Sequence, residues 1–245
     1  MTKRARDTKN PQRAQPAAPA SAFSGAGRAH RTSVAVVLIL YLALATAYVF
    51  RLPIDAAPDE SAHRVYVGWL AENRRLPVFD PADAQHYELH QPPLYYALCL
   101  PAYYAAGGGR DVARLTHAVR FVNVLLGLVV VLLAFVFVGH LAPHRPWAAV
   151  GAAAFVAFLP MQLVLCASIN NDVLSQALTT GVLCLLVGQV RAGRVLVAQE
   201  RRGSRKRGRD EHPEWRTAAG SGFTARRMAL VGVLAALALL TKSQA

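Results

Sequence analysis

Long runs of apolar residues without a charged side chain constrain this chain more than any other feature. Apolar residues make up 54% of the 245-residue sequence and come in continuous blocks rather than in alternation. A helix needs roughly 20 such residues to cross the hydrocarbon core of a bilayer. We therefore expect an all-α polytopic membrane protein. The expected spans lie at about residues 33–50, 118–141, 147–167, 172–190 and 228–243.

Charge is distributed unevenly between the segments outside these spans. The tail at 1–32 has seven Lys and Arg against one acid, and the loop at 191–227 has eleven against four. Positively charged loops stay on the cytoplasmic side of a membrane. We therefore expect a cytoplasmic N-terminus, with a disordered tail at 1–32, and a cytoplasmic loop at 191–227. The Arg-rich run at 201–209 fits this topology, and we expect no nucleic-acid partner.

One apolar stretch, residues 92–106, is too short to span a bilayer. It contains Pro101 and is followed by three glycines at 107–109. Both features favour a re-entrant or interfacial segment. A full span there would also move the basic loop at 191–227 to the outside. The Ala-Thr-Ala at 45–47 resembles a signal cleavage site, but the apolar run continues beyond it, which favours an uncleaved anchor.

The first outer loop, residues 51–92, reverses the charge of the chain, with seven acids against four Arg. Within it, apolar residues with helical spacing predict an amphipathic helix lying flat at the membrane surface. These residues are Ala62, Val65, Tyr66, Trp69 and Leu70. Asp59 and Glu60 stand at the start of this helix, with His63 on the same face. Acids there are typical either of helix capping or of a catalytic site.

Five short strings follow one another along the chain: PDESAH (58–63), HQPPLYY (90–96), RFVNVLLG (120–127), SINND (168–172) and LLTK (239–242). In this order they resemble the GT-C glycosyltransferases, most closely glycosyltransferase family 39 and related bacterial lipid-carrier-dependent enzymes. The resemblance covers about residues 33–245 and corresponds to the N-terminal half of such an enzyme. We therefore expect the chain to be a fragment of a longer one.

The resemblance implies a GT-C-like helix bundle in a bacterial inner or plasma membrane. Such enzymes move a sugar from a polyprenyl-phosphate donor to a lipid, glycan or protein acceptor on the extracytoplasmic side. Asp59 would be the general base, with Glu60 beside it. Many relatives have Lys where this chain has Gln91. The residues expected to bind substrate are His63, His90, Gln91, Arg114, Arg120, Asn171, Asp172 and Lys242.

Several roles have two interpretations at this stage. Asp172 either faces the substrate cavity or caps the span that follows it. Lys242 either contacts the carrier phosphate or marks the membrane interface. We expect no cluster of metal ligands, although a single divalent ion between Asp59 and Asp172 fits some enzymes of this fold. The alternative functions are a membrane scaffold, a transporter or an inactive fragment.

Overall fold

The computed structural model describes residues 21–78, 84–206 and 225–241. Within these residues all regular structure is helical. The α-helices are α1 (Ser21–Arg51), α2 (Glu60–Asn73), α3 (Leu94–Ala105), α4 (Val112–Leu141), α5 (Pro146–Phe158), α6 (Pro160–Cys166), α7 (Asp172–Lys206) and α8 (Ala225–Leu239). The 3-10 helices are η1 (Ala84–His90) and η2 (Gly108–Arg110).

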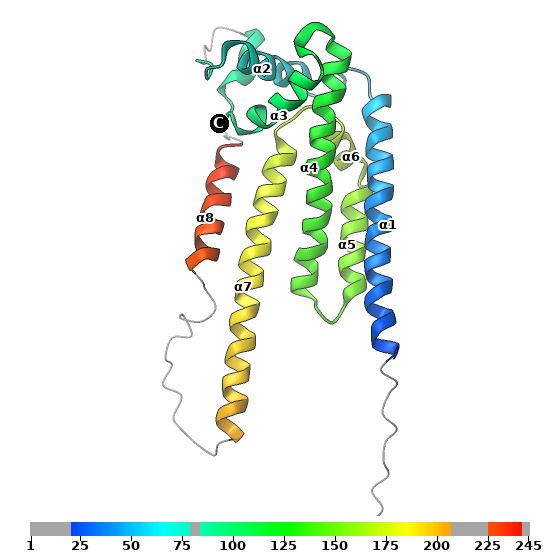
Figure 1. The fold of residues 1–245 in the computed structure, drawn as a ribbon, viewed down its shortest axis with the longest axis vertical. Helices are drawn as coiled ribbons and strands as arrows, with labels where there is room; N and C mark the ends of the chain where they lie inside the picture. The colour runs from blue at the N-terminus through cyan, green and yellow to red at the C-terminus, as the bar shows by residue number, and fades with distance from the viewer. Residues whose placement is uncertain (1–20, 79–83, 207–224, 242–245) are drawn as a thin grey trace, which may run out of the picture.

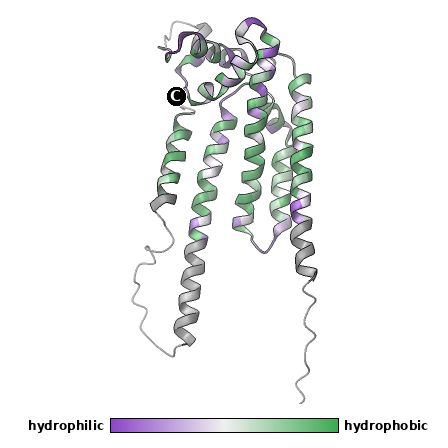
Figure 2. Cartoon of the chain, viewed as in Figure 1, coloured by the Kyte–Doolittle hydropathy of each residue, from purple (hydrophilic) through white to green (hydrophobic). Residues whose placement is uncertain are grey.

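Helices α1, α4, α5, α7 and α8 run side by side along the long axis, and α2 lies across one end of them with α3 beneath it (Figure 1). We call this the capped end, and the opposite end, where α4 turns into α5, the turn end. Three helical segments are long and apolar enough to cross a membrane: His30–Arg51, Val112–Leu141 and Asp172–Arg191. Apolar residues dominate their length in Figure 2. The chain therefore has the character of an all-α membrane protein.

The expected single span at 147–167 is broken in the structure. Helices α5 and α6 meet at an angle of 64° on either side of Leu159, and the two together have the length of a fourth span. Pro160 explains the break, because proline disfavours a helical conformation in the residue before it. Leu159 is accordingly extended, with φ −67° and ψ 119°. The apolar part of α8, Met228–Leu239, is shorter than the three long spans.

Two long helices extend beyond their expected ends. Helix α1 begins at Ser21, so residues 21–32 are helical rather than disordered, and α7 continues to Lys206, well into the expected loop at 191–227. The second extension is rich in good helix formers such as Arg, Leu and Gln, whereas the first contains three Ala among Ser and Gly residues. A helix already nucleated by a span propagates readily into such sequence.

The interior consists of two apolar clusters. One joins α1, α4, α5, α6 and the start of α7 along the bundle; the other joins α2, α3, α4 and the start of α7 at the capped end. In the first cluster the hydroxyl of Tyr41 donates to the carbonyl oxygen of Val124 at 3.1 Å. A Cβ at Gly127 would overlap the Tyr41 hydroxyl and the Cys166 sulfur. The second cluster holds α2 and α3 over the bundle and so positions the residues between them.

Candidate functional site

A buried ion pair between Glu60 and Arg120 lies beneath the capped end. Arg120 Nε and Nη2 each donate to a Glu60 carboxylate oxygen at 2.7 Å. Its remaining N–H groups donate to the carbonyl oxygens of Val49, Leu52 and Pro53 at 2.8–2.9 Å. An Arg side chain has five N–H donors, and all five are used here. Arg120 therefore has no donor left for a ligand phosphate.

The Glu60 carboxylate likewise accepts hydrogen bonds from several groups within the protein. Besides Arg120 it accepts the backbone N–H of Asp55 at 3.0 Å and that of Ile169 at 3.1 Å. Only 1% of Glu60 is exposed. The carboxylate thus ties the start of α2 to α4 and to the 168–171 loop before α7. The structure places these two predicted site residues, Glu60 and Arg120, in an internal contact with each other rather than on an accessible surface.

Asp59, the residue before Glu60, has the opposite environment. Its backbone is left-handed, with φ 58° and ψ 7°, and its exposed side chain makes no capping hydrogen bond to α2. The carboxylate instead accepts a hydrogen bond from the hydroxyl of Tyr87 in η1. Burial first, and then this carboxylate, raise the pKa of the Tyr87 hydroxyl. Asp59 is therefore the accessible member of the acidic pair, and its side chain does not act as a helix cap.

From Tyr87 a series of polar contacts crosses the capped end to the start of α7. The carbonyl oxygen of Tyr87 is in contact with Nδ1 of His90, and His90 Nε2 lies 3.1 Å from the amide nitrogen of Gln91. The Asn171 amide donates to the Gln91 side-chain oxygen at 3.3 Å and to the carbonyl oxygen of Thr241 at 2.9 Å. We call Asp59, Tyr87, His90, Gln91 and Asn171 the polar chain. It brings together four of the predicted site residues.

A second polar group lies under the polar chain, between α2, η1 and α3. His63 Nδ1 is 2.9 Å from the Tyr96 hydroxyl and 3.7 Å from the Glu88 carboxylate. Burial first, then the Glu88 carboxylate, raises the pKa of the Tyr96 hydroxyl, and Asp172 contributes to the same shift. The rings of Tyr66 and Tyr96 stack with their centroids 3.7 Å apart. His63 therefore lies buried beside the Tyr96 hydroxyl.

The cap of α7 is Asn170 rather than Asp172. The Asn170 side-chain oxygen accepts the backbone N–H groups of Asp172 at 3.1 Å and Val173 at 3.4 Å, as an N-cap residue does. Asn123 of α4 fixes the same loop, because its amide donates to the carbonyl oxygens of Ser168 at 2.6 Å and Asn170 at 3.0 Å. The Asp172 carboxylate is thus not needed as the cap of this helix.

An apolar groove of about 680 Å³ adjoins the polar chain. The two meet where α3 begins and α8 ends: the backbone N–H of Leu94 donates to the carbonyl oxygen of Leu240 at 3.3 Å. Gln91 and Thr241 are the neighbouring polar residues. Arg74, the C-cap of α2, contributes a cationic side chain to the groove. The groove is lined by Leu70, Arg74, Leu76, Pro93, Leu94, Ala97, Leu100, Tyr104 and Leu240.

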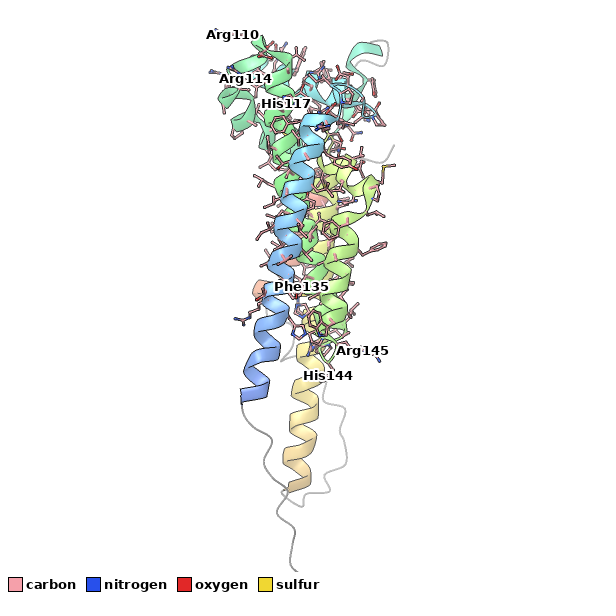
Figure 3. All side chains as sticks on the ribbon, turned by 90° about the vertical axis from the view of Figure 1, so that its right-hand side faces the viewer. Arg110, Arg114, His117, Phe135, His144 and Arg145 are labelled. Carbon is pink, nitrogen blue, oxygen red and sulfur yellow. The ribbon has the colours of Figure 1, made fainter. Side chains whose placement is uncertain are left out.

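Two predicted residues are not part of this arrangement as described. Arg114 lies exposed in the first turn of α4, at the capped end, where its backbone N–H donates to the Asp111 carboxylate at 3.0 Å (Figure 3). The contacts described for Arg114 do not reach the polar chain. Lys242 falls outside the described residues. Tyr87 and Glu88 were not among the predicted site residues, because single residues in a short 3-10 helix carry no periodic signal.

The residues described here offer few ligands for a metal ion. Among them, no group of three or more His, Cys, Asp or Glu side chains is arranged to hold one. A single ion between Asp59 and Asp172 stays a prediction. Comparisons with protein-family models, with curated proteins and with solved structures find no match for this chain. The functional argument therefore rests on the geometry of the capped end and on the sequence strings.

Proposed function

We propose that this chain is the N-terminal part of an integral membrane glycosyltransferase of the GT-C type. It would transfer a sugar from a polyprenyl-phosphate donor to an acceptor at the capped end, with Asp59 as the general base. One observation carries the proposal: at one end of a membrane bundle, an accessible carboxylate is connected through a line of polar side chains to the edge of an apolar groove.

Each part of this arrangement suits one part of such a substrate. An apolar groove suits the first isoprene units of a carrier lipid, because burying them removes apolar surface from water. The imidazole of His90 and the amide of Gln91 suit the hydroxyls of a sugar.

The reaction needs a base for the acceptor and a stabiliser for the departing phosphate. Asp59 would take the proton from the acceptor hydroxyl as that oxygen attacks the anomeric carbon and the bond to the carrier phosphate breaks. The Tyr87 hydroxyl orients the carboxylate by donating to one of its oxygens. Because Glu60 is locked to Arg120, Asp59 is the better base of the two. Arg120 is fully committed and is therefore not a candidate for this phosphate contact.

The substitution Asp59→Asn tests the proposal. Removing a general base lowers a rate by about 10²- to 10⁴-fold, so we expect Asp59→Asn to lose at least about 100-fold in transfer. The measurement is transfer of labelled sugar from polyprenyl-phosphate donors in membranes. The chain is compared alone and extended through any downstream reading frame, since it is proposed to be the N-terminal part of the enzyme.

A matched control lies four residues away in the same loop. Asp55 is also exposed with a left-handed backbone, but its carboxylate is held by Arg64 at 2.6 and 2.9 Å. The hydrogen bond and charge of Arg64 lower the pKa of Asp55. Asp55→Asn should leave transfer within a few-fold of the unmodified protein. Full activity of Asp59→Asn would indicate Asp172 as the base instead. If the inserted protein transfers sugar from none of the donors, the proposal of a glycosyltransferase is refuted.

A further inference from the structure

The turn end carries several basic and aromatic residues where α1 and α5 meet. The rings of His30 and Trp147 are in edge contact, with centroids 4.4 Å apart. Arg31 follows His30 directly, while His144 and Arg145 precede Trp147 in the turn between α4 and α5. Arg31, His144 and Arg145 are all exposed. Figure 3 shows His144 and Arg145 together at this end of the bundle. We call Arg31, His144, Arg145 and Trp147 the turn-end patch.

No acid whose side chain is described lies near this patch. The acidic residues whose side chains are described all belong to the capped end or to its loops. They are Asp55, Asp59, Glu60, Glu72, Glu88, Asp111 and Asp172. The charges of the turn-end patch are therefore not neutralised by a described carboxylate of the chain. Arg191 of α7 adds a further cation at this end, donating to the carbonyl oxygens of Gly139 and His140 at 3.3 Å.

The position of Trp147 indicates the depth at which the turn-end patch lies in a membrane. Its side chain is 58% exposed, at the start of α5 and at the same end as the boundary of the span His30–Arg51. Exposed tryptophan at the end of a span is typical of the headgroup level of a bilayer. Arg31 and Arg145 flank the His30–Trp147 contact in sequence and thus lie near the depth of lipid phosphates, with which guanidinium groups form strong charge-assisted hydrogen bonds.

We propose that the turn-end patch binds the phosphate headgroup of an anionic phospholipid in the leaflet on that side of the membrane. The patch lies at the opposite end of the bundle from Asp59 and does not depend on the glycosyltransferase proposal. Its ligand is a lipid phosphodiester with a net negative charge, selected over zwitterionic lipids by the two arginines. A basic site of this kind on a helix bundle is a recognised way to hold anionic lipids.

The test uses Trp147 as its own reporter. The sequence contains three tryptophans, so the full-length variant Trp69→Phe/Trp215→Phe leaves Trp147 as the single fluorophore. The protein is reconstituted in phosphatidylcholine vesicles, with either brominated phosphatidylglycerol or brominated phosphatidylcholine as quencher. The ratio of the two quenching constants gives the preference of the patch for the anionic lipid. We expect a clear preference for phosphatidylglycerol, to which each arginine contributes up to about fivefold.

Two double variants make the test specific. Arg31→Gln/Arg145→Gln should abolish the preference, whereas Arg110→Gln/Arg114→Gln removes the same charge from exposed residues at the capped end and should leave it unchanged. Arg31→Lys/Arg145→Lys keeps the charge and should retain most of the preference for the anionic lipid, which shows that the patch still folds. Equal quenching by both lipids in the unmodified patch overturns the proposal, as does a preference that survives Arg31→Gln/Arg145→Gln.

Discussion

At the scale of single residues, the ion pair of Glu60 and Arg120 is the contact on which the capped end depends most. Removing one partner leaves the other buried and charged, which lowers the free energy of unfolding by about 3–5 kcal/mol. We therefore expect Arg120→Met and Glu60→Gln to lower the thermal midpoint of the detergent-solubilised protein strongly. Arg120→Lys should rescue little, because a lysine has three donors and cannot replace five.

The control for this prediction is Arg64→Met. Arg64 also pairs with a carboxylate, that of Asp55, but Asp55 is exposed. Exposed ion pairs contribute about 1 kcal/mol or less, so Arg64→Met should change the midpoint little. Similar midpoints for Arg64→Met and Arg120→Met would contradict the structural role assigned to Arg120.

The adjacent acids Asp59 and Glu60 also show what a sequence reveals about single residues. Their position after Pro58 and before an amphipathic stripe correctly indicated a helix start. Nothing in the local sequence distinguished the two acids, because the burial of Glu60 depends on its contact with Arg120, 60 residues further along the chain. The sequence therefore predicted an acidic pair, and only the tertiary contact assigns Glu60 to the interior and Asp59 to the surface.

At the scale of elements, the close contact of α4 with α1 and α6 centres on Gly127. A Cβ there would overlap both the Tyr41 hydroxyl and Cys166. Overfilling a packed interior costs about 1–3 kcal/mol, so Gly127→Ala should lower the thermal midpoint in detergent. Gly139→Ala is the matched control in the same helix, because a Cβ at Gly139 meets nothing within 4 Å. Equal midpoints for the two variants would refute this packing.

Helix α2 illustrates how well an element can be predicted from periodicity. The stripe containing Ala62, Val65 and Tyr66 correctly predicted a helix, but its buried face is rotated from the expected one. Val65 is 40% exposed, whereas His63 and Val67 are buried. The reason is that α2 packs on α3 through polar as well as apolar contacts, including that of His63 with Tyr96. Hydropathy alone counts only the apolar ones.

At the scale of the whole molecule, the separation of charge between the two ends predicts orientation. Basic segments stay on the cytoplasmic side, so the turn end should face the cytoplasm and the capped end the outside. Cysteines introduced one at a time by Val65→Cys and His144→Cys should react with a membrane-impermeant maleimide from opposite sides of oriented membranes. The described native cysteines, Cys99, Cys166 and Cys184, are buried and give little background. Labelling of both positions from one side would contradict this topology.

The bundle as a whole was easier to predict from the sequence than its capped end. Three apolar runs correspond to helices long enough to span a membrane, because their length and lack of charge are local properties. The break at Leu159 was missed, although Pro160 marked it. The polar chain and the groove were not foreseeable as units, since they join η1, α3, α7 and α8 through contacts such as that between Gln91 and Asn171, 80 residues apart.

The hydrogen bond from Asn171 to Thr241 has a consequence for the order in which the molecule is made. The two residues are 70 positions apart, so a ribosome adding about 5–20 residues per second needs roughly 4–14 s to pass from one to the other. During that interval α1 to α7 can already be inserted, while the Asn171 amide lacks the acceptor that α8 will bring. The capped end is thus the last part of the described bundle to close during synthesis.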